Sequence, residues 1–168
     1  MQRRTWLKLG LASAAVLAVG GAAVALVEPG LRDARLSAAG RAVFSGVGGA
    51  MLDGSLPAHG AARQAALAGM LERIDALVAG LPPHAQAELS QLLALLASGG
   101  GRRALAGLSQ DWESAPVPDI QAALQAMRVS RISLRQQAYQ ALHDIAGSAY
   151  FSDASTWGML GYPGPLKI

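Results

Sequence analysis

The longest run of apolar residues in the chain lies near the N-terminus. Residues 9–27 contain no charged side chain, whereas three basic residues occur among the first eight. A short basic head followed by an apolar run is typical of a targeting segment. As a helix rising about 1.5 Å per residue, this run would span roughly 28 Å, close to the hydrocarbon thickness of a bilayer. We therefore expect a signal peptide or membrane anchor over residues 1–30 and a folded domain over residues 31–168.

After residue 27 the apolar positions recur every three or four residues, which is the spacing of amphipathic helices. Val, Ile and Thr, the residues that favour strands, are scarce there beside Ala, Leu, Gln and Arg. The pattern predicts an all-α domain, a small helical bundle that follows the apolar N-terminal helix. The expected helices cover residues 33–53, 61–79, 84–97, 118–128 and 131–149, with a short helical turn ending at Trp112 within residues 102–112.

The spacing also assigns single positions to the core or to the surface. In the helix 61–79 one buried stripe leaves Asp75 outside it. In the helix 131–149 both Ile132 and Tyr139 fall on the buried side, and Ser130 stands where an N-cap is expected. The stripe of the helix 61–79 consists of Leu67, Met70, Leu71, Ile74, Leu77 and Val78.

Two glycine-rich segments are candidates for phosphate-binding loops. Residues 46–49 lack the third glycine of a dinucleotide fingerprint, because Met51 takes its place, and no strand is expected before them. Close helix packing explains these glycines more simply, although they weaken the later turns of the first helix. Residues 99–103 could cradle an anion at a helix start, but no Lys-Ser/Thr pair follows. We expect residues 98–101 to be a flexible break in the chain.

Half of the eight aromatic residues fall within the thirteen positions from 150 to 162. Ser152 or Asp153 can cap a short helix that runs to Leu160 and ends at Gly161, before a strap of alternating proline and glycine that cannot be helical. Rings beside such a strap offer rigid contact area for a partner. The alternative is that they fold back and close the bundle. The candidate partner-binding residues are Tyr150, Phe151, Trp157, Tyr162, Pro163 and Pro165.

The basic head is similar to the twin-arginine export signal, in which two arginines precede an aromatic residue, Leu and Lys. Its one departure is Gln2, where Ser or Thr is usual. An ordinary amphipathic helix would have a polar face, which residues 9–27 lack. No Ala-x-Ala site precedes Pro29, so cleavage and retention as an anchor both stay open. The signal residues are Arg3, Arg4, Trp6, Leu7 and Lys8.

Charge and composition exclude several classes of function. The net charge of +3 comes from the basic head: without its three residues, 11 of the 14 Lys and Arg residues remain against 11 Asp and Glu residues. A neutral domain gives no electrostatic footprint for nucleic acid. The absence of cysteine excludes disulfides, a lipoprotein anchor and covalent haem attachment.

No set of residues has the spacing of a metal or catalytic site. His59, His84 and His143 lie in different segments, and the side chains of His143 and Asp144 are expected to diverge around a helix. A hydrolase or binding protein that uses His143 would have neither a nucleophile nor an orienting acid. We therefore expect no metal, no cofactor and no catalysis on this chain alone.

Taken together, residues 31–165 resemble the gluconate 2-dehydrogenase subunit 3 family. The resemblance lies in the first helix with Leu36-Ser37-Ala38-Ala39-Gly40, the turn Gly54-Ser55-Leu56-Pro57, the break Leu81-Pro82-Pro83 and the ending Ala149-Tyr150-Phe151-Ser152-Asp153, Trp157 and Leu160-Gly161-Tyr162-Pro163-Gly164-Pro165. It implies a small accessory subunit of a large flavoprotein of the glucose–methanol–choline type. FAD and the catalytic base then belong to the partner, and a cytochrome c often completes the complex.

Two functions from different classes follow. In the first, the chain is a non-catalytic subunit that assembles with a periplasmic FAD-dependent dehydrogenase. It then exports this partner through the twin-arginine translocase, because a flavoprotein folded around FAD can cross with a partner that carries the signal. In the alternative, the chain is a free-standing periplasmic scaffold anchored in the inner membrane. The substrate of the dehydrogenase cannot be read from this chain.

Overall fold

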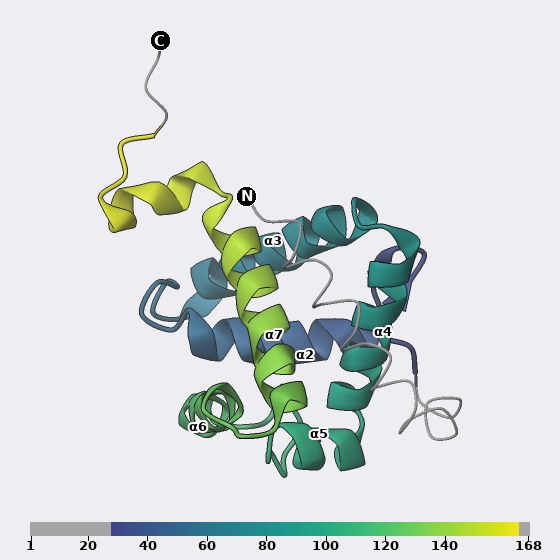
Figure 1. Ribbon diagram of the computed structural model, residues 1–168. Helices are drawn as coiled ribbons and strands as arrows, with labels where there is room; N and C mark the ends of the chain where they lie inside the picture. Colours follow the sequence, from purple (N-terminus) through teal and green to yellow (C-terminus); the bar gives the residue numbers. More distant parts are fainter. Residues whose placement is uncertain (1–27, 165–168) are drawn as a thin grey trace.

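The computed structural model describes residues 28–164. The predicted export signal and Pro165 lie outside the described residues. Apart from one short hairpin, the described elements are helices (Figure 1). They are β1 Leu31–Arg32, β2 Arg35–Leu36, α2 Ala38–Met51, α3 Gly60–Ala79, α4 Pro83–Ala97, α5 Gly99–Leu105, α6 Val117–Arg128, α7 Ser133–Phe151 and the 3₁₀-helix η2 Ala154–Leu160. Among residues 28–164, no helix has the length and hydropathy needed to cross a membrane.

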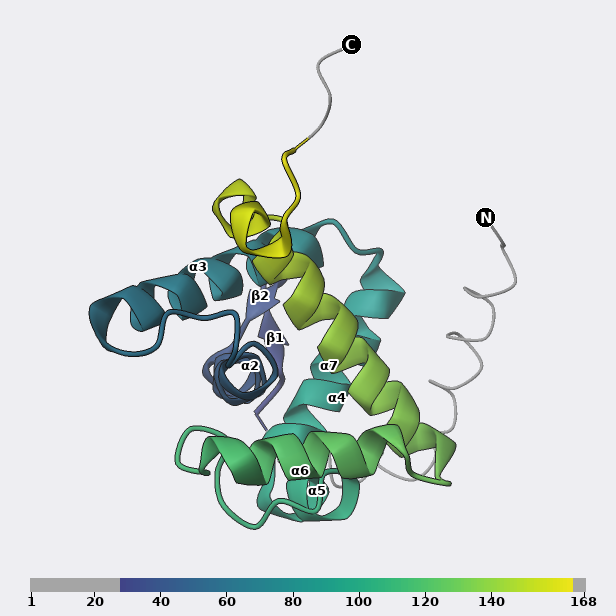
Figure 2. The ribbon, with the colours of Figure 1, turned by 90° about the vertical axis from the view of Figure 1, so that its left-hand side faces the viewer.

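Helix α2 is the centre of the bundle. It packs against α3, α4, α6 and α7, and Figure 2 shows it nearly end-on with these helices around it. Val43, Phe44 and Val47 have no exposed surface. Since the glycines of the same helix are also buried, α2 is covered on almost every side.

The glycines of α2 allow its neighbours to approach closely. A Cβ on Gly46 would lie 2.5 Å from the carbonyl oxygen of Trp112, and one on Gly48 would meet the Met70 side chain. Trp112 is 3% exposed, and its indole N–H donates a hydrogen bond of 2.8 Å to the carbonyl of Leu96. Close packing therefore explains these glycines, as predicted, and α2 continues through them to Met51.

The four helices predicted over 61–79, 84–97, 118–128 and 131–149 are confirmed with shifts of one or two residues at their ends. The start of the first helix was predicted wrongly, because residues 31–36 form an antiparallel hairpin in which Leu31 pairs with Leu36. Its two turn residues, Asp33 and Ala34, both have positive φ angles, as a two-residue hairpin turn requires. Asp33 tolerates this conformation but Ala34 does not favour it, so the sequence carried only half of a turn signal.

The expected position of Asp75 was also wrong. This carboxylate is 9% exposed, accepts a 2.8 Å hydrogen bond from the Leu36 N–H and pairs with Arg41. It thus connects α3 to the hairpin and to α2. A buried carboxylate needs such partners, and these lie 34 and 39 positions away in sequence. Helical periodicity cannot reveal them.

The predicted break at residues 98–101 is a helix start. Ser98 caps α5 by accepting a hydrogen bond from the Gly101 N–H, and the three glycines are helical. A Cβ on Gly101 would lie 2.6 Å from the Leu95 side chain, so glycine permits the sharp corner between α4 and α5. The short helix ends at Leu105, well before Trp112.

The start of α7 differs from the prediction at two positions. Ile132 is 58% exposed, because the helix begins only at Ser133 and the isoleucine belongs to the turn after α6. The Ser130 hydroxyl accepts a hydrogen bond from the Ile132 N–H and orders this turn, but it does not cap the helix. Tyr139 packs against the core as expected.

A pair of matched substitutions in α2 tests the role of its glycines. Gly46→Ala should lower the free energy of unfolding by about 1–3 kcal/mol, because the added methyl group overlaps the backbone at Trp112. Gly49→Ala should raise it by about 0.5–1 kcal/mol, since its Cβ meets no atom within 4 Å and alanine favours the helix. Urea unfolding followed by circular dichroism measures both changes. Equal effects of the two substitutions would contradict the packing assigned to Gly46.

Candidate interaction site

The aromatic residues of the C-terminal segment separate into an interior and an exterior group. Tyr150 is 3% exposed and its hydroxyl donates a 2.7 Å hydrogen bond to the carbonyl of Ser55. It continues the buried side of α7 after Leu142 and Ala146. Burial raises the pKa of its phenol above the ordinary value. Of the predicted partner-binding residues, Tyr150 therefore lies inside the bundle and presents no contact surface, while Phe151 is half-buried beside it.

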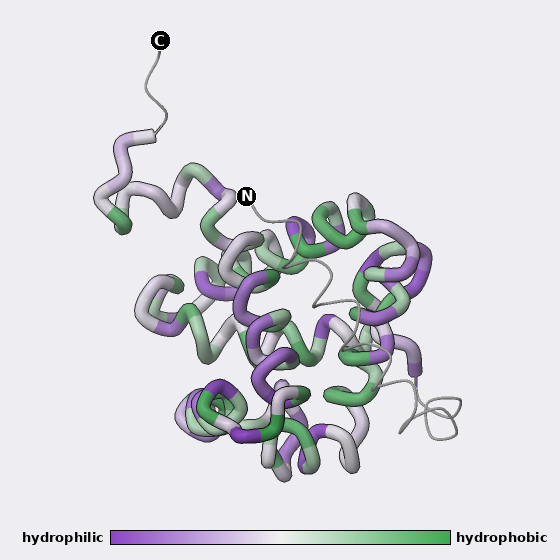
Figure 3. The backbone as a smooth tube through the Cα atoms, in the orientation of Figure 1, coloured by the Kyte–Doolittle hydropathy of each residue, from purple (hydrophilic) through white to green (hydrophobic). Residues whose placement is uncertain are grey.

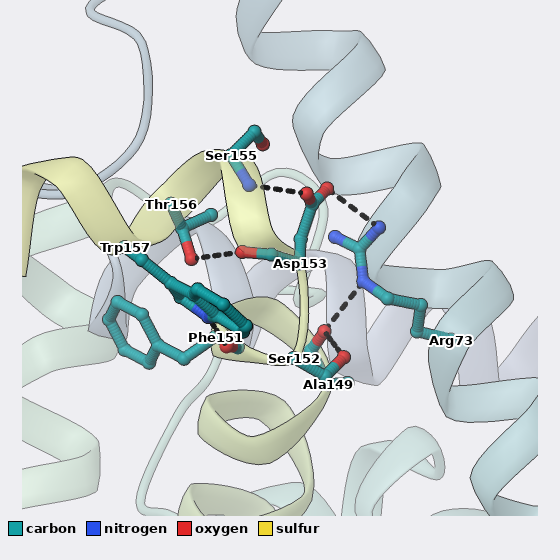
Figure 4. Close-up of polar contacts among 8 residues, drawn as sticks. All are labelled: Arg73, Ala149, Phe151, Ser152, Asp153, Ser155, Thr156 and Trp157. Carbon is teal, nitrogen blue, oxygen red and sulfur yellow. Dashed lines mark hydrogen bonds and ion pairs between the residues drawn. The ribbon is translucent and has the colours of Figure 1, made fainter. Parts of the chain in front are cut away.

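Beyond α7 the chain is held by Arg73 of α3 (Figure 4). The Arg73 Nε donates to the carbonyl of Ala149 at 2.6 Å, and its terminal nitrogen lies 3.1 Å from the Asp153 carboxylate. One guanidinium thus grips both the last turn of α7 and the cap of η2. Its planar set of donors suits such a double contact better than an ammonium group would.

The 3₁₀-helix η2 has the cap and the stop that the sequence predicted. The Asp153 carboxylate accepts a 2.9 Å hydrogen bond from the Ser155 N–H, and Gly161 ends the helix with φ of 69°. The Thr156 hydroxyl donates to the Asp153 carbonyl at 2.7 Å. The hydrogen bond from Ser155, more than the charge of Arg73, holds the pKa of Asp153 below its ordinary value.

Trp157 organises the strap that follows. Its indole N–H donates a 2.9 Å hydrogen bond to the carbonyl of Phe151, and its ring meets the edge of Tyr162 at a centroid distance of 5.3 Å. The backbone of Gly164, with φ of 95°, returns to the same indole ring. Trp157 is therefore partly covered by its own segment and acts as a support for the rings around it.

Several apolar side chains of this segment are exposed. Met159, Leu160 and Tyr162 are 56%, 55% and 48% exposed, and we call these three residues the tail patch. Figure 1 shows η2 and the strap projecting past the end of α7, and Figure 3 shows a hydrophobic stretch at the outer end of η2. The rings at 157 and 162 do not close the bundle. Exposed apolar side chains grouped in this way are typical of interaction sites.

An open recess of about 380 Å³ lies beside the tail patch, between the loop before α3 and η2. Its apolar lining includes Leu56, Pro57 and Met159, and its polar lining includes Arg73, Asp153 and Thr156. Arg73 pairs with the Asp153 carboxylate, and the Thr156 hydroxyl donates to the Asp153 carbonyl. The polar groups of the recess that the structure pairs, Arg73, Asp153 and Thr156, are therefore engaged with one another.

The histidines are placed differently from the expectation in one respect. The side chains of His143 and Asp144 approach to 3.1 Å instead of diverging. They are 50% and 59% exposed, respectively. Asp144 also accepts a hydrogen bond from Gln140. Among residues 28–164 no three potential ligands gather around a metal position.

In comparisons with known proteins, no family model, no curated protein and no solved structure matches the chain. The site is therefore described from its own geometry. Sequence reasoning located the aromatic segment and its caps, but it missed Arg73. That arginine lies on the outward side of its helix, and its contacts with Ala149 and Asp153 bridge 76 and 80 positions.

The cap at Asp153 makes the segment sensitive to acid. Because its pKa is lowered in the folded state, the contribution of Asp153 to stability is present above its unfolded pKa of about 3.9 and is lost as the pH falls through the folded value. The indole N–H resonance of Trp157 should shift below about pH 4 as η2 loosens. NMR titration measures this shift. Asp153→Asn should remove the transition, and its persistence in that variant would assign it to another group.

Proposed function

We propose that this chain is a non-catalytic helical subunit that assembles with a large FAD-dependent dehydrogenase of the glucose–methanol–choline type and carries it to the periplasm. The observation that supports this most is the tail patch, three exposed apolar residues mounted on a braced segment outside the bundle. Tyr162 is 48% exposed even though its ring packs against Trp157. A partner with an apolar pocket would bury it together with Leu160 and Met159.

The bracing of the segment supports a role in recognition. Arg73 fixes its base, the Ser155 hydrogen bond fixes η2, and Trp157 fixes the strap. A surface that is ordered before binding loses less conformational entropy when a partner arrives. The prolines of the strap, of which Pro163 is exposed, reduce that cost further.

The export part of the proposal rests on the N-terminal motif and on the resemblance to the gluconate 2-dehydrogenase subunit 3 family. A flavoprotein acquires FAD by folding around it, so it must cross the membrane as a folded protein. The twin-arginine translocase exports folded proteins, and a partner that carries the signal can lead the flavoprotein across. In this proposal FAD and the reaction belong to the large subunit, a cytochrome c can complete the complex, and the chain itself acts on no substrate.

Export can be tested at the arginine pair. Arg3→Lys together with Arg4→Lys should leave the protein and its flavoprotein partner in the cytoplasm, because lysine keeps the charge but lacks the planar guanidinium. Fractionation with antibodies to both proteins measures the distribution. Arg32→Lys with Arg35→Lys is the matched control and should leave export unchanged. Normal periplasmic amounts of the first variant would contradict the twin-arginine assignment.

Assembly can be tested at the tail patch. Tyr162→Ala should weaken association with the flavoprotein roughly thirty-fold or more, because burying such a ring in a partner contributes about 2–4 kcal/mol. Trp157→Ala should have a similar effect by releasing the strap. Pull-down from the periplasm and titration of the purified proteins measure the loss.

The control for these variants is Ile132→Ala, which removes an exposed apolar side chain at the other end of α7. It should leave the association unchanged. Circular dichroism melts of all three variants should stay near the wild type, since none of the residues belongs to the buried core. Intact pull-down and co-export of Tyr162→Ala and Trp157→Ala would favour the free-standing scaffold instead.

A further inference from the structure

The turn between α6 and α7 is the second exposed apolar surface of the described chain. Val129 and Ile132 are 63% and 58% exposed, more than any residue of the tail patch. Arg128 and Arg131 alternate with them, and both arginines are exposed. We call these four residues the turn patch. It stands at a corner of the bundle where two helix ends meet, as Figure 2 shows.

The segment that contains this turn carries charge of one sign only. From Ile120 to His143 the sequence contains three arginines and no Asp or Glu. Within residues 28–164, five other arginines pair with carboxylates, whereas Arg128, Arg131 and Arg135 make no ion pair. Arg128 and Arg135 each use their Nε in a hydrogen bond to a nearby side-chain or backbone oxygen. This is a local cationic surface on a domain whose described part has no excess of positive charge.

We propose that the turn patch is a contact site for an anionic phospholipid surface. Aliphatic side chains at the tip of a convex turn can enter the headgroup layer, while guanidinium groups beside them bind lipid phosphates. A basic residue near an anionic bilayer strengthens binding about fivefold. The combination fits a surface that is uniformly negative outside and apolar beneath.

A protein partner fits this turn less well. Protein interfaces are richest in aromatic residues and are usually flat or concave at their core, features that belong to the tail patch and its recess. The two patches lie at opposite ends of α7, whose 19 residues correspond to roughly 28 Å of helix. A bilayer at the turn therefore leaves the tail patch accessible.

The chain contains no cysteine, so one introduced thiol gives a specific label. The full-length protein carrying Val129→Cys with an environment-sensitive fluorophore is placed in nanodiscs of phosphatidylglycerol and phosphatidylcholine in equal parts, with nitroxide-labelled lipid as quencher. We expect blue-shifted and quenched emission that high salt reverses. The same label at Ala87→Cys, an exposed position of α4, should remain unquenched.

Charge variants distinguish a specific contact at the turn patch from attraction of the whole protein by its net charge. Arg128→Gln and Arg131→Gln should each lower about fivefold the ratio of molecules whose turn patch contacts lipid to molecules whose turn patch does not. Ile132→Ser should lower this ratio further, because it removes apolar contact. Arg32→Gln with Arg35→Gln, which removes two positive charges from the hairpin, twice the charge removed by either single variant, should have little effect. Circular dichroism should show all variants folded, since these side chains are exposed.

Three results would overturn the proposal. The first is equal quenching at Val129→Cys in pure phosphatidylcholine. The second is an equal loss of quenching in the Arg32 and Arg35 variant, which would mean that net charge alone attracts the protein. The third is a label that lipid leaves unchanged and that becomes shielded only when the purified flavoprotein is added, which would make the turn a protein interface.

Discussion

Helix α2 must be buried on almost every side, and the arrangement of the other helices depends on this. A helix with large side chains all round would keep its neighbours apart. Here Val43, Phe44 and Val47 fill the interior, while glycines at 46 and 48 let Trp112 and Met70 approach the backbone itself. The cost is weak helix propensity, about 1 kcal/mol for each glycine relative to alanine. Packing from four surrounding helices offsets it, so α2 is a helix because of its neighbours.

Polar contacts then fix the parts that apolar packing leaves free. Asp75 on α3 binds the Leu36 N–H and Arg41, so the short hairpin and the start of α2 are held by one carboxylate. Arg73, two positions earlier on the same helix, holds the other end of the structure through Ala149 and Asp153. Both side chains bridge segments far apart in sequence. Helix α3 thereby sets the position of the hairpin and of the C-terminal segment alike.

Helix α7 separates two surfaces with different chemistry. At its start the turn patch combines aliphatic side chains with unneutralised arginines, and past its end the tail patch combines apolar side chains with a rigid aromatic support. The first suits a charged and fluid surface, the second a shaped pocket. If both proposals hold, a protein partner and a bilayer would bind at opposite ends of α7. The rigid helix between them sets their separation.

The sequence by itself determined the helical class, the approximate bounds of four long helices, the stop signals around η2 and the packing role of the glycines in α2. These follow from local rules: apolar spacing, capping residues and the lack of strand-forming residues. Only the tertiary structure decided that Asp75 is buried, that Tyr150 is interior while Tyr162 is exposed, that residues 31–36 form a hairpin and that Ile132 stands in solvent. Each of these findings depends either on partners tens of positions away or on the residue at which a helix ends. The apolar periodicity of a single segment encodes neither the distant partners nor the helix end.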